Sequence, residues 1–395
     1  HNAIVWQCRR TEAFCETLRQ AGHADTFRHK TGLVLDPYFS GTKIRWILDH
    51  TQSHARAQAG ELAFGTVDSF LINRLTGGSV HATDVTNASR TLMMDLNSCD
   101  WDPWCLEQLG VPKAVLPDIR PCDGFFGATQ GVPGLPDGIP IHGVLGDQHA
   151  ALFGQACFAA GEAKCTYGTG AFLLANVGDK PVHSTCGLLA TPAWNLGGTT
   201  TYALEGATFI AGAAVQWFRD GLGLIQSATE IEALATSVPD SDGVIFVPAL
   251  AGLGAPHWRA DARGAFFGLS RGTTKAHLAR AILDGIALQI VDLLGAVADD
   301  SGSPIERLRV DGGAAANNFL MQTQADLLGI SIDRPPVLEA TGLGAALIAG
   351  LGVGMFSSLD DLRTTWRAER CFNPNQDQAW RDDWMQRWAQ ATANC

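Results

Sequence analysis

Residues 141–153 read IHGVLGDQHAALF, and this stretch decides the fold class that the sequence predicts. The apolar run 141–145 predicts a buried strand, Gly146 begins a tight turn, and residues 149–153 predict a helix. Short apolar runs alternate with amphipathic stretches along the rest of the chain in the same way. This alternation favours helices layered on a sheet, which is the α/β class.

Two more glycine turns lie downstream of this unit. Residues 167–170 (YGTG) stand between two apolar runs, which predicts the turn of a strand hairpin. The apolar run 308–310 leads through residues 311–313 (DGG) into a predicted helix that ends at Gly329. The apolar face of that helix is formed by Met321, Ala325 and Leu328.

A short helix is predicted over residues 68–75. Asp68 is of a residue type that caps helix N-termini, and Gly77 stands where a helix would stop. Phe70 and Leu71 are expected to supply its apolar face. These side chains would then anchor the helix to a core.

Three other patterns predict buried segments. Apolar residues recur every four positions through 277–297, which predicts a long core-facing helix. The run 4–6 (IVW) predicts the middle of a buried strand. A final helix should bury a stripe made of Trp380, Trp384 and Trp388.

Composition limits the class of protein. A formal net charge of -12 argues against nucleic acid as a partner, and the 46% of hydrophobic residues can build a large core. The longest apolar candidate, 345–355, falls short of the ~20 residues that span a bilayer. Ten cysteines form no C-x-x-C pair, so we expect free thiols and a cytoplasmic location. The length predicts two domains, 1–155 and 156–395, hinged near residues 154–161.

Asp147 is the first candidate for chemistry, because it follows a predicted strand at the edge where α/β proteins build their sites. Its carboxylate could take a proton from a substrate hydroxyl or hold Mg²⁺, and Gln148 could hydrogen-bond that hydroxyl. The same position is also typical of a helix N-cap, with Gln148 a solvated residue of the first turn. The spacing alone leaves both interpretations open.

The other two turns can approach a phosphate or a nucleotide closely. Glycine backbone and the Thr169 hydroxyl could wrap a phosphate, although a plain hairpin turn explains residues 167–170 as well. Residues 311–318 (DGGAAANN) carry few large side chains, so a nucleotide could lie on them beside Asn317, or a helix could simply pack closely there. Neither turn matches a Walker A loop or a G-x-G-x-x-G fingerprint.

Trp6 and Tyr38 could form an apolar wall for a small polyol, because aromatic faces pack against C–H groups; each could equally be a core residue. The 11 histidines show no metal-ligand spacing, and no G-x-S-x-G elbow is present. The sequence therefore disfavours zinc hydrolases and serine hydrolases.

Long runs of this sequence resemble the FGGY carbohydrate kinases, most closely the members that phosphorylate glycerol. The runs similar to the two family signatures are residues 38–50 (YFSGTKIRWILDH) and residues 264–269 (GAFFGL) through 281–284 (AILD). Further similar runs are 3–7 (AIVWQ), 83–91 (TDVTNASRT) and 252–258 (GLGAPHW). The resemblance extends over essentially the whole chain.

This resemblance implies a two-domain actin/hexokinase-like (ribonuclease H-like) α/β fold and ATP-dependent phosphorylation of glycerol with Mg²⁺. It implies that Asp147 is the catalytic base and a metal ligand, in a homo-oligomer of two or four chains. The implied glycerol-binding residues are Trp6, Tyr38, Asp147, Gln148 and Phe172. The implied ATP- or ADP-binding residues are Thr169, Gly212, Gln216, Gly313 and Asn317. The alternatives are another polyol or ketose kinase and a nucleotide-binding module without catalysis.

The sequence departs from the family pattern at two places. Members begin with a D-Q-G-T-T-type phosphate loop and carry an Arg-Glu pair for glycerol, and neither precedes Ile4. We therefore expect that the first domain lacks an N-terminal segment and that these 395 residues are weakly active or inactive. Residues 130–135 (QGVPGL) align with the family's regulator-binding stretch but carry no cation, so we expect no feedback inhibition by fructose 1,6-bisphosphate.

Overall fold

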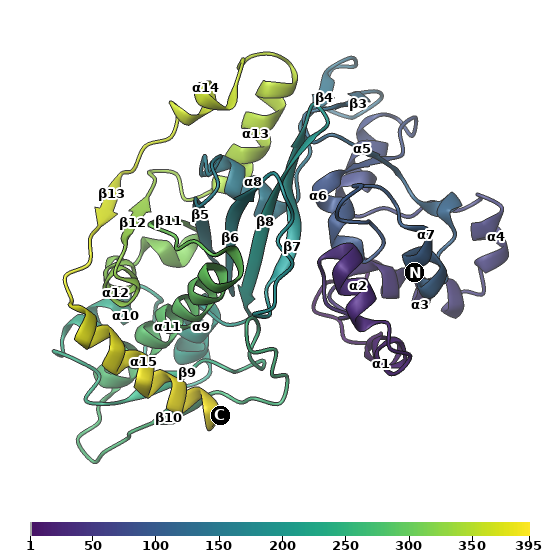
Figure 1. Ribbon diagram of the computed structural model, residues 1–395. Coiled ribbons are helices and arrows are strands. Elements are labelled where there is room, and N and C mark those ends of the chain that lie inside the picture. The colour runs from purple at the N-terminus through teal and green to yellow at the C-terminus, as the bar shows by residue number, and fades with distance from the viewer. Residues whose placement is uncertain (1) are drawn as a thin grey trace.

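The computed structural model describes residues 2–395, and its centre is a mixed seven-stranded sheet with helices on both faces (Figure 1). The strand order is β13-β12-β11-β5-β6-β8-β7. Parallel pairing joins β12 to β11 and β11 to β5, and the remaining neighbours are antiparallel. The strands are β5 (Ala163–Tyr167), β6 (Ala171–Gly178), β7 (Leu189–Leu196), β8 (Thr199–Thr208), β11 (Arg307–Asp311), β12 (Ser331–Arg334) and β13 (Arg370–Phe372).

Alternate side chains along each strand enter two different cores. Leu173 of β6 belongs to the larger core, whereas its neighbour Leu174 belongs to the second core on the opposite face. The larger core is covered by helices from the second half of the chain: α9 (Gly212–Asp220), α10 (Glu230–Thr236), α11 (Lys275–Ser301), α12 (Asn318–Leu328) and α15 (Gln378–Ala393). The short antiparallel strands β9 (Ile245–Val247) and β10 (Ala265–Phe267) lie beside them.

On the other face, α8 (Asp147–Gly154) packs closely against α13 (Ala340–Gly352). A Cβ on Gly154 would lie 2.2 Å from the Ala340 carbonyl oxygen, so only glycine permits this approach. The helix after α13 is α14 (Leu359–Arg363). Both α8 and α13 contribute to the second core, which continues into the N-terminal part of the chain.

That N-terminal part is mostly helical and lies beside β7 (Figure 1). Its short strands form a parallel pair, β1 (Ala82–Asp84) with β2 (Asp118–Arg120), and an antiparallel pair, β3 (Phe125–Ala128) with β4 (Pro140–His142). Its helices are α1 (Glu12–Gln20), α2 (Ala24–Thr31), α3 (Ser40–His50), α4 (His54–Gln58), α5 (Val67–Leu75), α6 (Val85–Ala88) and α7 (Pro103–Leu109), with 3₁₀ turns η1 (Ser89–Thr91) and η2 (Lys113–Val115).

Most of the strongly patterned segments are confirmed. The YGTG turn joins β5 and β6 as a hairpin, and the DGG turn leads from β11 through η3 (Gly313–Ala316) into α12, which ends at Gly329. In α15, Trp384 and Trp388 are buried in the larger core and Trp380 packs against it.

The long helix predicted over 277–297 is confirmed as α11. It corrects the expectation that residues 345–355 are the longest apolar candidate for a membrane span. Its mean hydropathy reaches 1.8 over 18 residues, so α11 is long and apolar enough to cross a membrane. However, 78% of that window is buried inside the protein. In this structure the helix forms part of the larger core.

Of two further strand predictions, one is wrong and the other is confirmed only in part. Residues 4–6 form no strand, and Val5 and Trp6 are 61% and 45% exposed, because no neighbouring strand pairs with them. The strand predicted over 141–145 is limited to β4, which within residues 2–395 pairs with β3 alone and lies outside the large sheet. An apolar run sets which residues favour burial, but pairing partners decide whether a strand forms.

The helix predicted over 68–75 exists as α5, but its details differ. It begins at Val67, and Asp68 is in the first turn, where it accepts hydrogen bonds from the hydroxyls of Thr66 and Thr83. Phe70 and Leu71 are exposed, whereas Ile72 enters a small core with Ala82 and Phe126. Only one face of α5 is covered by the protein, and Ile72 lies on that face, whereas Phe70 and Leu71 do not.

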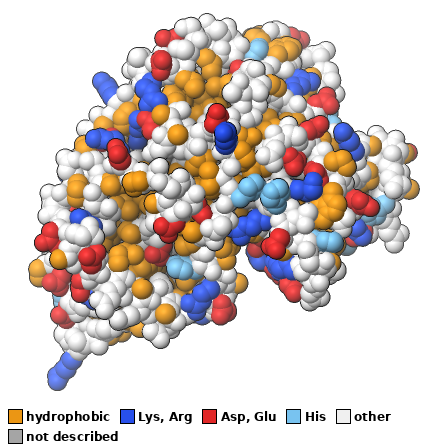
Figure 2. All heavy atoms as spheres, in the orientation of Figure 1, with side chains coloured by type: hydrophobic (Ala, Val, Ile, Leu, Met, Phe, Trp, Pro, Cys, Tyr) orange, Lys and Arg blue, Asp and Glu red, His pale blue; other side chains and the backbone are white. Residues whose placement is uncertain are grey.

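The surface carries charge of both signs. On the face drawn in Figure 2, acidic and basic side chains are interspersed and are not segregated by sign. All ten cysteines are free thiols, as the sequence predicts.

Candidate active site

Asp147 is the first residue of α8, and its carboxylate is exposed. The N-cap of this helix is Gly146, so the interpretation of Asp147 as an N-cap is wrong. One carboxylate oxygen accepts a hydrogen bond from the backbone N–H of Gln148 at 2.8 Å. The exposed carboxylate therefore remains accessible to a partner outside the protein.

The run 83–91 fixes the turn in front of Asp147. Buried Asp84 accepts hydrogen bonds from the backbone N–H and the hydroxyl of Thr86, at 2.8 and 2.6 Å. The Thr86 hydroxyl oxygen in turn accepts the backbone N–H of Gly146 at 2.8 Å. Burial, followed by the negative charge of Asp68, raises the pKa of Asp84 to about 6.

Lys164 lies behind Gln148, and the sequence interpretation did not single it out. This β5 side chain is fully buried, and its ammonium donates to Gln148 Oε1 at 2.6 Å, to Thr166 Oγ1 at 3.0 Å and to the Phe172 carbonyl at 3.3 Å. Burial lowers the pKa of Lys164, and the nearby carboxylates, first that of Asp311, oppose this effect. A positive charge is thus held directly beside the predicted substrate-binding amide.

The same contacts lead from α8 to the DGG turn. Thr166 hydrogen-bonds the buried carboxylate of Asp311, whose pKa is raised by burial. Asp311 also accepts the side-chain N–H of Gln155 at 2.8 Å. Because Asp311 immediately precedes Gly312, a continuous chain of polar contacts links Gln148 to this turn.

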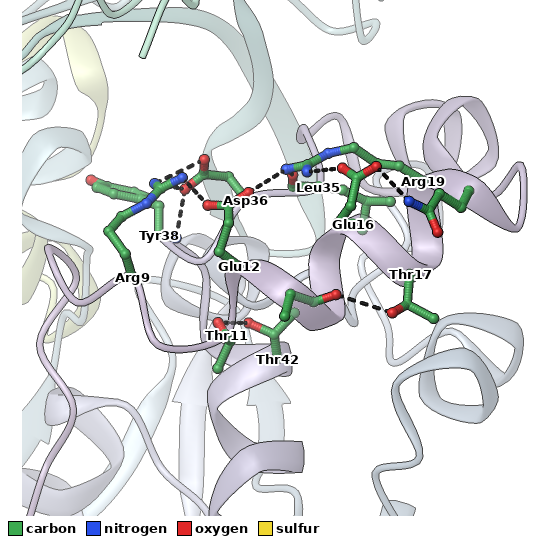
Figure 3. Close-up of polar contacts among 12 residues, drawn as sticks. Arg9, Thr11, Glu12, Glu16, Thr17, Arg19, Leu35, Asp36, Tyr38 and Thr42 are labelled. Atoms are coloured by element: carbon green, nitrogen blue, oxygen red, sulfur yellow. Dashed lines mark hydrogen bonds and ion pairs between the residues drawn. The ribbon is translucent and has the colours of Figure 1, made fainter. Parts of the chain in front are cut away.

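Trp6 and Tyr38 meet on the N-terminal side of the site. Their rings contact edge to face, with centroids 5.4 Å apart. As Figure 3 shows, Asp36 accepts the backbone N–H of Tyr38 at 2.8 Å and ion-pairs with Arg9 at 2.8 Å. Arg9 also pairs with Glu12 of α1, so the segment that carries Trp6 is tied to the loop that carries Tyr38.

Arg90 and Glu205 are two more charged residues that sequence interpretation missed. Arg90 of η1 and Glu205 of β8 form an ion pair with N–O distances of 2.7 and 2.8 Å, across 115 positions of sequence. Burial raises the pKa of Tyr38, Arg90 lowers it, and the charges of Glu205 and Asp147 raise it further. We call Tyr38, Arg90, Asp147, Gln148, Lys164 and Glu205 the charged cluster.

The predicted nucleotide-contacting residues come from three backbone turns that touch one another. The backbone N–H of Gly212 donates to the Gly168 carbonyl at 2.9 Å. Gly312 has φ +86°, and a Cβ there would lie 2.6 Å from the Tyr167 carbonyl oxygen. We call residues 168–170, 211–213 and 312–313 the glycine turns.

The remaining predicted residues lie at or next to these turns. Thr169 and Gly313 are exposed, and a Cβ on Gly313 would meet no atom within 4 Å. Gln216 is exposed one helical turn after Gly212 in α9. Asn317 caps α12 through its side-chain oxygen, which accepts the N–H of Leu320 at 2.9 Å. Its amide nitrogen is left for another partner.

A divalent cation fits this site only if the protein and the substrate phosphates hold it together. Within residues 2–395, no group of three or more His, Cys, Asp or Glu side chains could hold a metal. Mg²⁺ in phosphoryl-transfer sites commonly has one or two protein carboxylates, with substrate phosphates and water as the other ligands. The exposed carboxylate of Asp147 is compatible with that arrangement.

Comparison with known proteins identifies relatives over the whole length of the chain. Residues 1–154 match the N-terminal domain of the FGGY family of carbohydrate kinases, and residues 163–353 match its C-terminal domain. A glycerol kinase of Myxococcus xanthus is 57% identical over 393 residues, which cover 99% of this chain and 79% of that protein. A glycerol kinase of Aromatoleum aromaticum is 57% identical over 390 residues, 98% of this chain and 78% of that protein.

Solved structures of kinases have the same fold as this chain. The structure of Plasmodium falciparum glycerol kinase with ADP superposes with a TM-score of 0.93 at 36% identity, covering 100% of this chain and 79% of that one. A gluconate kinase from Lactobacillus acidophilus superposes with a TM-score of 0.87 at 23% identity, covering 99% of this chain and 78% of that one, which speaks for the fold alone. The predicted two-domain actin/hexokinase-like fold is confirmed.

Proposed function

The chain belongs to the FGGY family of carbohydrate kinases, and from this premise we propose that it transfers the γ-phosphate of ATP to a hydroxyl of glycerol. Relatives named glycerol kinase are 53–59% identical over 90–99% of this chain. The observation that carries the proposal is the exposed Asp147 carboxylate, connected through Gln148, Lys164 and buried polar groups to the DGG turn.

Asp147 acts as the general base. A glycerol oxygen forms a bond to the γ-phosphorus while the bond to the ADP oxygen breaks, and the hydroxyl proton passes to the Asp147 carboxylate. Gln148 and Tyr38 hydrogen-bond glycerol hydroxyls, and Trp6 and Phe172 contact its carbon atoms. The Trp6–Tyr38 ring contact and the hydrogen bonds of Gln148 support these roles.

The glycine turns bind the nucleotide. Thr169, Gly212 and Gly313 bring the backbone close to the phosphates, and the exposed side of Gly313 leaves room for ADP or ATP. Contacts from Gln216 and Asn317 complete the proposed set. Mg²⁺ held by Asp147 and the phosphates would neutralise charge on the transferring group.

The proposal extends to the domain division, the cellular location and the oligomeric state. The two domains would divide between residues 155 and 156, next to the end of α8 at Gly154, and hinge there. The free thiols are compatible with a cytoplasmic location. A dimer or tetramer of this chain would be detected by light scattering.

The test is a phosphotransfer assay with ATP and a panel of acceptors. We expect ADP formation to depend on glycerol, with glycerol 3-phosphate as the product. Turnover of xylulose or gluconate above that of glycerol would assign the chain to another kinase of the family. Thermal stabilisation by ADP without phosphotransfer to any acceptor would favour a nucleotide-binding module.

A further inference from the structure

Lys164 is a buried cation with only neutral hydrogen-bond partners. It is 0% exposed, and among residues 2–395 its ammonium forms no ion pair. Its three donors are directed to the side chains of Gln148 and Thr166 and to the carbonyl of Phe172. Burying a charge is costly unless it is both hydrogen-bonded and paired with an opposite charge, and Lys164 meets only the first condition, so this arrangement calls for a reason beyond packing.

The contact with Lys164 fixes which end of the Gln148 side-chain amide faces inward. A glutamine amide can donate or accept on either side, whereas an ammonium only donates. The 2.6 Å contact with Lys164 therefore requires the Gln148 oxygen on its inner side. The amide nitrogen then lies on the outer side, next to the exposed Asp147, and donates a hydrogen bond to a carboxylate oxygen of Asp147 at 3.4 Å. Its second N–H is left for another partner.

We infer that Lys164 is a positioning residue that makes Gln148 a hydrogen-bond donor toward the acceptor substrate. This inference rests on the proposed phosphorylation of glycerol. An outward amide nitrogen donates to a lone pair of the attacking hydroxyl oxygen, which leaves the hydroxyl proton for Asp147. Lys164 thus acts on the reaction through Gln148 and touches neither substrate.

A double-mutant cycle tests this role. Lys164→Met and Gln148→Met should each lower kcat/KM for glycerol by about ten- to a hundredfold. The first change frees the Gln148 amide to rotate its oxygen toward the substrate, and the second removes the amide donor. The double variant should lose little more than Gln148→Met alone, because the inference requires the effect of Lys164 on turnover to pass through Gln148. ADP affinity should stay near the wild-type value in all three variants, because the glycine turns are unchanged.

Independent, multiplicative losses in the double variant would overturn the inference, and so would wild-type kcat/KM in Lys164→Met. A wild type that transfers no phosphate to glycerol would instead overturn the proposed function, so the two failures are distinguishable.

A second variant keeps the test decisive if Lys164→Met does not fold. Gln148→Glu retains an oxygen for Lys164 and gains an ion pair with it, but it has no amide donor. We expect normal thermal unfolding together with a loss of kcat/KM at least as large as that of Gln148→Met. Turnover by Gln148→Glu near the wild-type level would contradict the requirement for a donor.

Discussion

The charged cluster and the glycine turns are adjacent, but they are built by opposite means. The cluster consists of side chains that contact one another, and Lys164 and Glu205 are almost completely buried. Lys164 hydrogen-bonds Gln148, and Glu205 forms an ion pair with Arg90 across 115 positions of sequence. The glycine turns are defined by the absence of side chains, and backbone groups such as the Gly212 N–H and Gly168 carbonyl bind one another directly. The geometry of the charged cluster therefore depends on the identity of its side chains, and the geometry of the glycine turns depends on their having no side chains.

This difference predicts that substitutions in the two regions have different effects. Changing a charge in the cluster should alter turnover or acceptor binding while the backbone stays in place. Adding an atom to a glycine turn should alter nucleotide binding or the fold, whatever its chemistry. The following substitutions separate these outcomes.

The largest effect is expected for Asp147→Asn. The amide keeps the size of the side chain but cannot take up the hydroxyl proton, so kcat should fall by at least ~10²-fold. Glycerol binding should be largely kept, because Gln148 and Tyr38 are unchanged. Steady-state kinetics and glycerol titration measure the two quantities, and retained turnover would show that Asp147 is not the base.

Two neighbouring glycines form a matched pair in the second region. Gly312→Ala places a Cβ 2.6 Å from the Tyr167 carbonyl at φ +86°, so it should destabilise the protein by roughly 1–3 kcal/mol. Gly313→Ala meets no protein atom within 4 Å, so it should unfold like the wild type. Its methyl group should nonetheless lower ADP affinity about tenfold, roughly 1.4 kcal/mol. Thermal unfolding and ADP calorimetry measure both, and wild-type ADP binding by Gly313→Ala would count against a nucleotide at this turn.

A smaller effect is expected for Trp6→Ala. The exposed ring makes one edge-to-face contact with Tyr38, and such contacts contribute about 0.5–1.5 kcal/mol. KM for glycerol should rise a few-fold while kcat and ADP affinity stay the same. Phe70→Ala on α5 is the control, because Phe70 is 62% exposed and lies outside the charged cluster. Equal KM values in the two variants would remove Trp6 from the glycerol site.

Asp284→Asn should change the free energy of unfolding and leave the affinities for glycerol and ADP unchanged. Asp284 of α11 lines a cavity of about 70 Å³, and burial raises its pKa to about 7, against the opposing charges of Arg280 and Arg387. A raised pKa means that the neutral form stabilises the fold at low pH and that this contribution is lost as pH rises through 7. The stability of the variant should therefore rise relative to that of the wild type between about pH 4 and about pH 7, by at most about 1.4 kcal/mol per pH unit, and the difference should level off above pH 7.

Thermal unfolding across that pH range measures the gain. A difference between variant and wild type that does not change with pH would show that Asp284 is ionised throughout.

Sequence patterns predicted the parts of the fold that depend on local periodicity. The stripes of α11 and α15 and the hairpin at residues 167–170 follow from side-chain spacing and turn chemistry, and they are confirmed. The strand predicted over 4–6 failed because strand formation depends on partners that no local run specifies. The exposed Phe70 shows the same limit for helix faces.

In the site, the turn that holds Asp147 could be recognised locally, but its environment could not. Lys164 contacts an amide 16 positions away, and Arg90 pairs with Glu205 across 115 positions. A lysine within an apolar strand was the available signal for Lys164, because a buried cation requires partners. The glycine turns gave a stronger signal, since their backbone geometry depends on the residue type itself.

Separate binding of the acceptor beside the charged cluster and of the nucleotide at the glycine turns is tested most directly by calorimetric titration. The variants are Trp6→Ala, which removes the ring that contacts Tyr38 of the cluster, and Gly313→Ala, and each is titrated with glycerol and with ADP alone. We expect Trp6→Ala to weaken glycerol binding and keep ADP binding, and Gly313→Ala to do the reverse. Loss of the same ligand in both variants, or of neither ligand in either variant, would contradict separate sites for the acceptor and the nucleotide.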